Sequence, residues 1–80
     1  EVSLLPAEAL GLAIQDKSEI LVYPFQLRVV TQSLCPVRVV QSYFRGHVYL
    51  VEARFFDRTI FFEHPTFLAT QTTVYLQYVV

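Results

Sequence analysis

Glycine and lysine are scarce in this 80-residue chain, which has two glycines (Gly11 and Gly46) and a single lysine, Lys17. A phosphate-binding P-loop needs a glycine-rich turn followed by Lys and Ser or Thr, and a dinucleotide fingerprint needs three closely spaced glycines. Neither pattern fits residues that lie this far apart. Nucleotide binding by either route is therefore excluded.

Methionine is absent and cysteine occurs once, as Cys35. A lone cysteine cannot form a disulfide within the chain, which is typical of proteins from a reducing compartment. A natural full-length protein normally starts with Met, so we expect a domain excised from a longer chain. Processing to a mature form is the alternative.

Charge is also low: 16% of residues are charged and the net charge is −1. Disorder needs low hydrophobicity and high net charge, so disorder is excluded. A net charge near zero, without an excess of Lys and Arg, gives no positive surface that would attract nucleic acid or an anionic membrane. No apolar run approaches the roughly 18 residues that span a bilayer, and no signal peptide is recognisable. We expect neither nucleic-acid binding nor direct membrane insertion.

The chain is rich in apolar residues, at 54%, with seven Phe and five Tyr. Eighty residues allow one domain, and a domain this small buries a modest share of its surface. Typical soluble domains are about 45–50% apolar. The excess predicts apolar surface that partner proteins cover. We expect a single domain over residues 1–80, with its core in residues 20–79.

Residues 1–19 allow two interpretations. Ala7, Glu8, Ala9 and Leu10 favour a short helix with Pro6 in its first turn. Alternatively, residues 2–5 and 10–14 form strands with a bend at Gly11. A turn is expected at residues 16–18 in either case.

β-branched and aromatic residues dominate the rest of the chain, which predicts strands. Pro24 ends the first of these strands, and Arg45-Gly46, Asp57-Arg58 and the 65–71 loop separate the later ones. Short connections between period-2 segments are typical of an antiparallel meander. The predicted strands cover residues 20–23, 27–30, 37–44, 47–56, 59–64 and 72–79.

Side chains alternate along the last three strands between an apolar and a mixed face. In the first of these strands, Tyr49, Val51, Ala53 and Phe55 share the apolar face. A small closed β-barrel fills its interior with such faces and removes free strand edges. The predicted fold class is therefore a mainly β, small antiparallel β-barrel. Aromatics left on the outside are candidates for an interface.

The residues that carry chemistry are isolated from one another. Glu63 and His64 are adjacent in a strand and point to opposite faces, and His47 is the only other histidine, so no metal site is expected. Cys35 has no partner base and is interpreted as a small buried apolar residue. We predict no catalytic, cofactor-binding or metal-binding residue, and hence no enzyme in this chain.

Two further patterns involve charged residues. Glu52 and Arg54 share a strand face and predict an ion pair. Arginines interleaved with aromatics are typical of small β-barrels that bind single-stranded nucleic acid, which stays an alternative although acidic residues offset them. The residues concerned are Arg38, Arg45, Arg54 and Arg58 among Tyr43, Phe44, Phe55 and Phe56, with Glu52, Asp57 and Glu63.

Residues 20–78 resemble the TOBE domain found at the C-terminus of ATP-binding subunits of ABC importers. In that family a strand ends in an Arg-Pro-Glu-x-Leu-type motif, a later strand enters a Phe/Leu-Gly turn, and a V-x-L strand closes the domain. Pro24, Leu27 and Gly46 match best, whereas Tyr23 and Phe25 replace the usual Arg and Glu. The counterparts here are Val22-Tyr23-Pro24-Phe25-Gln26-Leu27, Val37 to Gly46, Tyr49 to Ala53, Thr59 to Phe62, and Thr73-Val74-Tyr75-Leu76. The family usually has a glycine just before the last strand, where this chain has Gln71-Thr72.

The resemblance implies an OB-like barrel beyond a cytoplasmic ATPase domain, peripheral to the inner face of the cell membrane. It implies a regulatory or dimer-stabilising role, with the parent ATPase domain and membrane permease as further partners. ATP and Mg²⁺ would belong to the parent alone. The Ser, Asn, Gly and Lys motif of oxyanion-binding members is not visible, so no anion site is carried over from the family. A sensor domain for a small ligand such as an oxyanion or a sugar is a third alternative. The aromatics expected at a symmetric homodimer contact are Tyr43, Phe44, Phe61 and Tyr75.

Overall fold

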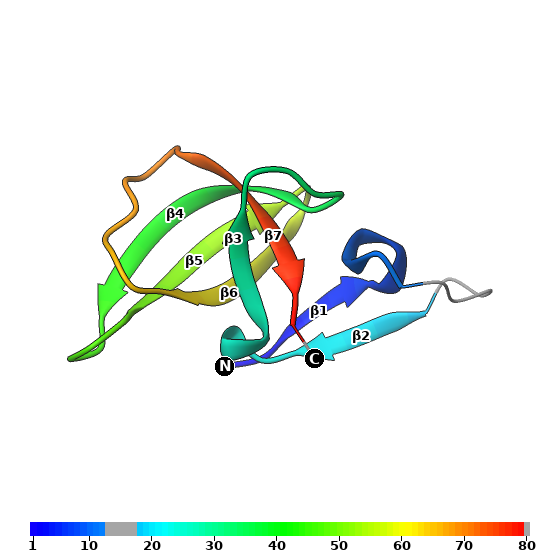
Figure 1. Cartoon of the computed structure of the whole chain (residues 1–80), viewed down its shortest axis with the longest axis horizontal. Coiled ribbons are helices and arrows are strands. Elements are labelled where there is room, and N and C mark those ends of the chain that lie inside the picture. Colours follow the sequence, from blue (N-terminus) through cyan, green and yellow to red (C-terminus); the bar gives the residue numbers. More distant parts are fainter. Residues whose placement is uncertain (13–17, 80) are drawn as a thin grey trace.

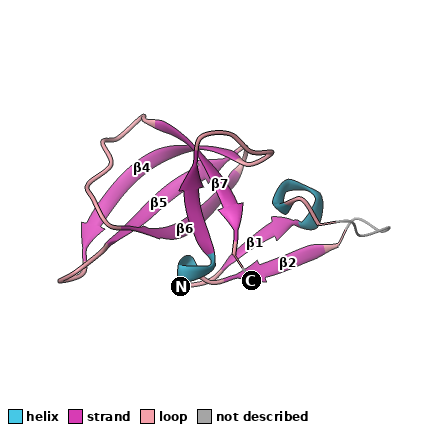
Figure 2. Ribbon diagram, in the orientation of Figure 1, coloured by secondary structure: helices cyan, strands magenta, loops and turns pink. Residues whose placement is uncertain are grey.

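The computed structural model describes residues 1–12 and 18–79 and is mainly β, as predicted (Figure 2). Strands dominate, with two single-turn 3-10 helices near the N-terminal side of the chain. The strands are β1 (Ser3–Pro6), β2 (Glu19–Val22), β3 (Leu27–Val30), β4 (Pro36–Phe44), β5 (Tyr49–Phe55), β6 (Arg58–His64) and β7 (Thr73–Tyr78), and the 3-10 helices are η1 (Ala7–Leu10) and η2 (Pro24–Gln26).

The N-terminal segment combines both predicted interpretations. β1 leads directly into η1, which ends at Gly11 with φ of 74°. The backbone N–H of Gly11 donates to the carbonyls of Ala7 and Glu8. The predicted strand at 10–14 is wrong at Leu10, which is in η1, and its last residues lie outside the described part, as do Asp16 and Lys17 of the predicted turn.

The hairpin turns differ from prediction by one or two residues. The turn after β4 extends to Val48, whose carbonyl accepts the N–H of Arg45 at 2.8 Å, so the next strand starts at Tyr49 rather than at residue 47. Gly46 supplies the positive φ, 93°, that this turn requires. The second turn holds Phe56 and Asp57, not Asp57 and Arg58.

The predicted order of the strands is wrong in one respect. Strands β4, β5 and β6 form the expected meander, but β7 pairs with β3 and β4, giving the order β3-β7-β4-β5-β6. The loop after β6 returns across the sheet, where Val39 and residues 71–72 exchange backbone hydrogen bonds of 2.7 and 2.8 Å. A bulge between Val39 and Gln41 shifts the β4–β5 register. Sequential pairing is the default for short loops, and this eight-residue loop, residues 65–72, departs from it.

The two sheets are open. β1 and β2 form a separate antiparallel hairpin, and the five-stranded sheet ends at β3 and β6. The sheet is curved, so β3 approaches β6, yet no ladder joins these fully described strands (Figure 1). The closed barrel predicted from the alternation is therefore not formed by strand pairing.

One core serves both sheets. Phe62 and Ile60 on β6, Leu5 on β1 and Val22 on β2 are fully buried in the same cluster. The alternation predicted for β6 and β7 is confirmed at Ile60, Phe62, Val74 and Leu76, which are buried. On β5, Val51, Ala53 and Phe55 are buried as predicted, but Leu50, predicted on the mixed face, is buried too, and Tyr49 is half-buried. The hairpin is thus packed onto the sheet by the same apolar side chains that hold the sheet together.

Candidate protein-binding surface

Cys35 is buried, as predicted. Its side chain is fully inaccessible and belongs to the core cluster. Burial raises the pKa of its thiol to about 11, so the thiolate is not formed near neutral pH. The role of Cys35 in this fold is packing.

Glu63 and His64, the other residues considered for chemistry, do not share a binding partner. Glu63 is exposed, while His64 Nδ1 lies 3.1 to 3.3 Å from backbone and hydroxyl atoms of Thr66. Within residues 1–12 and 18–79 there is no group of three or more His, Cys, Asp or Glu that could hold a metal ion.

The predicted ion pair between Glu52 and Arg54 is wrong. Glu52 Oε1 accepts the Tyr43 hydroxyl at 2.9 Å, and Arg54 donates to Thr59 Oγ1 at 2.7 Å. Cross-strand partners thus occupy both charged groups, which sequence spacing along one strand does not reveal. The hydrogen bond from Tyr43 to Glu52 raises the pKa of the phenol.

The four predicted contact aromatics do not form one patch. Tyr43 and Phe44 are exposed, and Phe61 and Tyr75 are half-buried. Neighbouring residues of a strand point to opposite faces, so Phe44 lies on the face opposite Tyr43. In the sheet order, β4 and β5 separate Tyr75 on β7 from Phe61 on β6.

Most of the exposed apolar surface lies elsewhere. Eleven large apolar side chains of the described residues are exposed, a large number for so short a chain. Phe56 is the most exposed, at 80%. The others are Val2, Leu4, Leu21, Tyr23, Phe25, Leu34, Tyr43, Phe44, Phe67 and Val79.

The first concentration is an aromatic cluster at the β4–β5 tip, made of Phe44, Tyr49 and Phe67. The rings of Phe44 and Tyr49 have centroids 5.2 Å apart, and Phe67 meets Tyr49 edge-on at 5.9 Å. Ser42 fixes the loop that carries Phe67, since its hydroxyl donates to the Leu68 carbonyl at 2.7 Å and accepts the Leu68 N–H at 3.3 Å. The cluster continues the inner apolar face of the sheet into solvent.

The second concentration is the outer face of the β1–β2 hairpin. Leu4 and Leu21 are directly opposite each other in the β1–β2 register and are 49% and 58% exposed. Their neighbours Leu5 and Val22 point the other way and are fully buried. The hairpin is therefore apolar on both faces, whereas a sheet with one solvated face is normally polar on that side.

The third concentration is a groove of about 450 Å³ between η1 and the β5–β6 turn. Its apolar lining includes Leu34, which is 71% exposed, and Phe55 and Phe56, whose rings meet edge-on with centroids 4.8 Å apart. The remaining lining residues are Pro6, Glu8, Ala9, Asp57 and Arg58.

Phe56 has an unusual backbone as well as an exposed ring. It has φ of 53° in the two-residue turn between β5 and β6. A left-handed conformation costs a non-glycine residue about 1–2 kcal/mol, and such turns strongly favour Gly, Asn or Asp. Residues held in this way are concentrated at binding and switch sites.

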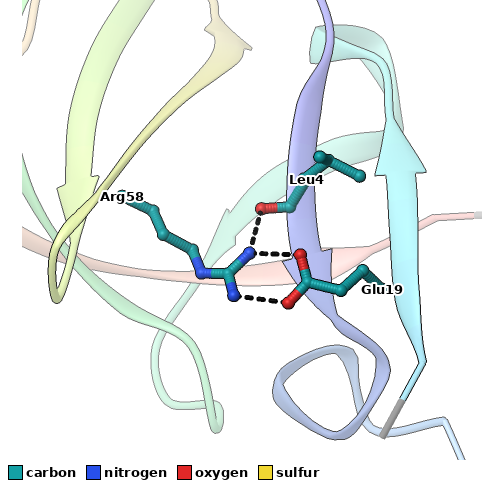
Figure 3. A network of polar contacts seen from close by, with 3 residues as sticks. All are labelled: Leu4, Glu19 and Arg58. Atoms are coloured by element: carbon teal, nitrogen blue, oxygen red, sulfur yellow. Dashed lines mark hydrogen bonds and ion pairs between the residues drawn. The ribbon is translucent and has the colours of Figure 1, made fainter.

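Arg58 joins the groove to the hairpin (Figure 3). Its guanidinium donates hydrogen bonds to both carboxylate oxygens of Glu19 on β2 and to the Leu4 carbonyl on β1, the latter at 3.1 Å. The hydrogen bond to Arg58 lowers the pKa of Glu19, and the same contact raises the pKa of Arg58. Ser3 Oγ accepts the N–H of Phe61 at 2.9 Å, which covers part of the free edge of β6.

Leu34 and Phe67 were not named as candidates from the sequence, and Phe56 was named only among the aromatics of the nucleic-acid alternative. Phe56 was assigned to the end of a strand, although its position beside Asp57 in a short turn is a signal of exposure. Phe67 lies in a predicted loop, where an aromatic side chain has no strand face to pack on. Only Phe44 of the most exposed residues was among the predicted contacts.

Comparison of the chain with protein-family models, curated proteins and solved structures finds no match in any of the three. No helix in the described part of the chain is long and apolar enough to cross a membrane.

Proposed function

We propose that this chain is a non-catalytic accessory domain of the TOBE type, which acts by packing against other proteins in an ABC importer. Its parent would be the ATP-binding subunit, and its partners would be a second copy, the parent ATPase domain and the permease. The domain would stabilise the paired ATPase domains between cycles. It would lie on the cytoplasmic side of the cell membrane, held there by the permease.

The observation that carries this proposal is the large apolar surface left exposed. Three separate concentrations occur, at the β4–β5 tip, on the outer hairpin face and around the groove. Exposed apolar patches on small soluble domains are typical of protein–protein contacts. A domain that contacts an ATPase domain, a second copy and a permease needs more than one such surface.

The best-matching positions of the resemblance have fitting roles in the fold. Pro24 is buried at the first position of η2, where its fixed φ suits a helix start. Leu27 is 2% exposed in the core. Gly46 has φ of 93°, which a glycine adopts without strain. These three roles support a TOBE-type chain path, which this chain would follow with an open, curved sheet.

The parent can be tested on the native protein. An antibody against the chain is used to isolate the full polypeptide, which is sequenced by mass spectrometry. We expect peptides with a P-loop, Gly-x-x-x-x-Gly-Lys-Ser/Thr, upstream of the sequence that starts at Glu1. A polypeptide without an ATPase domain would overturn the assignment to an importer.

Self-association is tested by sedimentation equilibrium. The aromatic cluster suits a symmetric contact because the same patch faces itself in a two-fold dimer. We expect a concentration-dependent dimer that Phe44→Ser weakens and that Phe61→Ala, at a half-buried position, affects less. A chain that is monomeric at every concentration would contradict the homodimer.

One observation favours the nucleic-acid alternative. Arg38 and Arg54 are exposed and directly opposite each other on β4 and β5, and like charges in such a pair repel. A bound phosphate would relieve that repulsion. Salt-dependent binding of a single-stranded oligonucleotide that Arg38→Gln abolishes would support this function, and no binding at low salt would exclude it.

A further inference from the structure

We infer that the groove between η1 and the β5–β6 turn receives a bulky apolar side chain presented by a basic segment of a partner protein. This inference rests on the proposed function, because it gives the chemistry of one partner of a domain that works by packing. The argument uses the shape of the groove, its charge and the conformation of Phe56.

The shape favours a protein segment over a small molecule. The groove volume of about 450 Å³ accommodates one large side chain. Its rim, however, protrudes: Phe56 and Leu34 are 80% and 71% exposed. A small ligand inside the groove would leave these side chains in water, whereas a partner surface laid over the groove would cover them.

The charge of the groove selects a basic partner. The side-chain carboxylates of Glu8 and Asp57 line it, and neither carboxylate has a hydrogen bond or ion pair within residues 1–12 and 18–79. Among the described residues of the lining Arg58 is the only cation, and it already binds both carboxylate oxygens of Glu19. Asp57 also attracts Arg58 electrostatically. The carboxylates of Glu8, Asp57 and Glu19 still outnumber this one guanidinium, so the region is negative beside aromatic rings and attracts Lys or Arg next to an apolar anchor.

Folding alone does not explain why a phenylalanine with a positive φ and an exposed ring is found at position 56. A glycine would suit its φ of 53° and would leave no apolar ring in water. The ring of Phe55 meets the ring of Phe56 edge-on at 4.8 Å, so Phe56 has one aromatic neighbour beside the groove before a partner arrives. Aromatic side chains beside pockets are common anchors of protein interfaces.

The test uses Phe56→Gly, which removes the ring and suits the backbone. The matched control is Phe67→Ser, which removes another exposed aromatic outside the groove. The probe is a capped peptide with Phe between two pairs of lysines, added to the full chain while amide chemical shifts are followed by NMR. Comparison peptides replace the lysines by Glu or the Phe by Gly, and free phenethylamine represents a small organic cation.

We expect the lysine-flanked Phe peptide to shift the amides of Glu8, Ala9 and Phe55 to Arg58, and to bind more weakly as salt increases. Phe56→Gly should weaken binding about tenfold or more, as loss of an anchor does, and Phe67→Ser should leave it unchanged. The acidic peptide should not bind.

The inference is overturned if the groove amides do not shift, if the acidic peptide binds equally, if Phe56→Gly binds like the wild type, or if phenethylamine binds as tightly as the peptide. Failure of the proposed function looks different. A native polypeptide without an ATPase domain would remove the importer and leave the groove result intact.

Discussion

The β1–β2 hairpin and the β4–β5–β6 meander are built from the same residue types, but they differ in which side chains lie on their outer faces. In the meander the inner residues are buried, and the outer face carries Glu52 and Arg54 with hydrogen-bond partners across the strands. In the hairpin the inner residues are also buried, but the outer face carries the Leu4–Leu21 pair in solvent.

This difference separates residues that serve the fold from residues that do not. Glu52 and Arg54 on the outer face of the meander have hydrogen-bond partners within the chain, and Leu5 and Val22 on the inner face of the hairpin are buried there. The outer leucines bury little within the chain, so folding alone does not explain them. Strong destabilisation is therefore expected from inner-face changes in both regions, and almost none from the outer hairpin face.

The largest effect is expected for Phe62→Ala in the meander. Phe62 is fully buried, and truncating a buried Phe costs about 3–5 kcal/mol. Its matched control is Phe61→Ala, the half-buried neighbour on the opposite face of β6. Urea unfolding followed by circular dichroism measures both variants. Equal losses for the two would contradict the two-faced description of β6.

Leu5→Ala tests whether the hairpin belongs to the same cooperative unit. Leu5 is fully buried in the core cluster shared with the sheet, and a Leu→Ala change there costs about 2–5 kcal/mol. Hydrogen exchange should show lower protection in β6 and β7 as well as in the hairpin. Loss of protection confined to β1 and β2 would show that the hairpin unfolds separately.

Much of the fold follows from local patterns. The ends of β3 were predicted without error, and the buried faces of β6 and β7 were predicted correctly because period-2 alternation reports burial. On β5 Leu50 departs from this alternation, since it is buried on the mixed face. The pairing of β7 was not predicted, since it depends on Ser42 and Val39 holding a returning loop. Such long-range hydrogen bonds leave no periodic signal in the sequence.

The candidate surface was harder to predict than the fold. Of the four aromatics predicted on the outside of the sheet, Tyr43 and Phe44 are exposed, and Phe61 and Tyr75 are half-buried. The groove depends on η1 lying beside the β5–β6 turn, a proximity between residues about fifty positions apart. Composition indicated excess apolar surface, but only the arrangement of elements shows where that surface is.

A smaller effect is expected from acid on the contact between hairpin and meander. Glu19 is bound by Arg58, so its pKa in the folded state lies below its ordinary value of 4.5. The folded state then binds fewer protons than the unfolded state, so this contribution is complete above about pH 4.5 and is lost as pH falls through the folded pKa.

Glu19→Gln removes this contribution. Its free energy of unfolding should fall less steeply with acid than that of the wild type, measured by urea unfolding at successive pH values. Glu63→Gln, at an exposed carboxylate without an ion pair in the described part of the chain, is the control. An unchanged acid dependence in Glu19→Gln would show that the Arg58 contact adds nothing in solution.

The smallest effect is expected on the outer face of the hairpin. The double variant Leu4→Thr, Leu21→Thr keeps the strand preference of both positions and allows a polar cross-strand pair. Because both side chains are about half exposed, stability should change by less than about 0.5 kcal/mol, whereas binding of the isolated native partners should weaken. Urea unfolding measures the first, and co-purification with the parent complex the second. A loss of stability comparable to Leu5→Ala would show that this face packs within the chain, and that the two regions differ less than their exposure indicates.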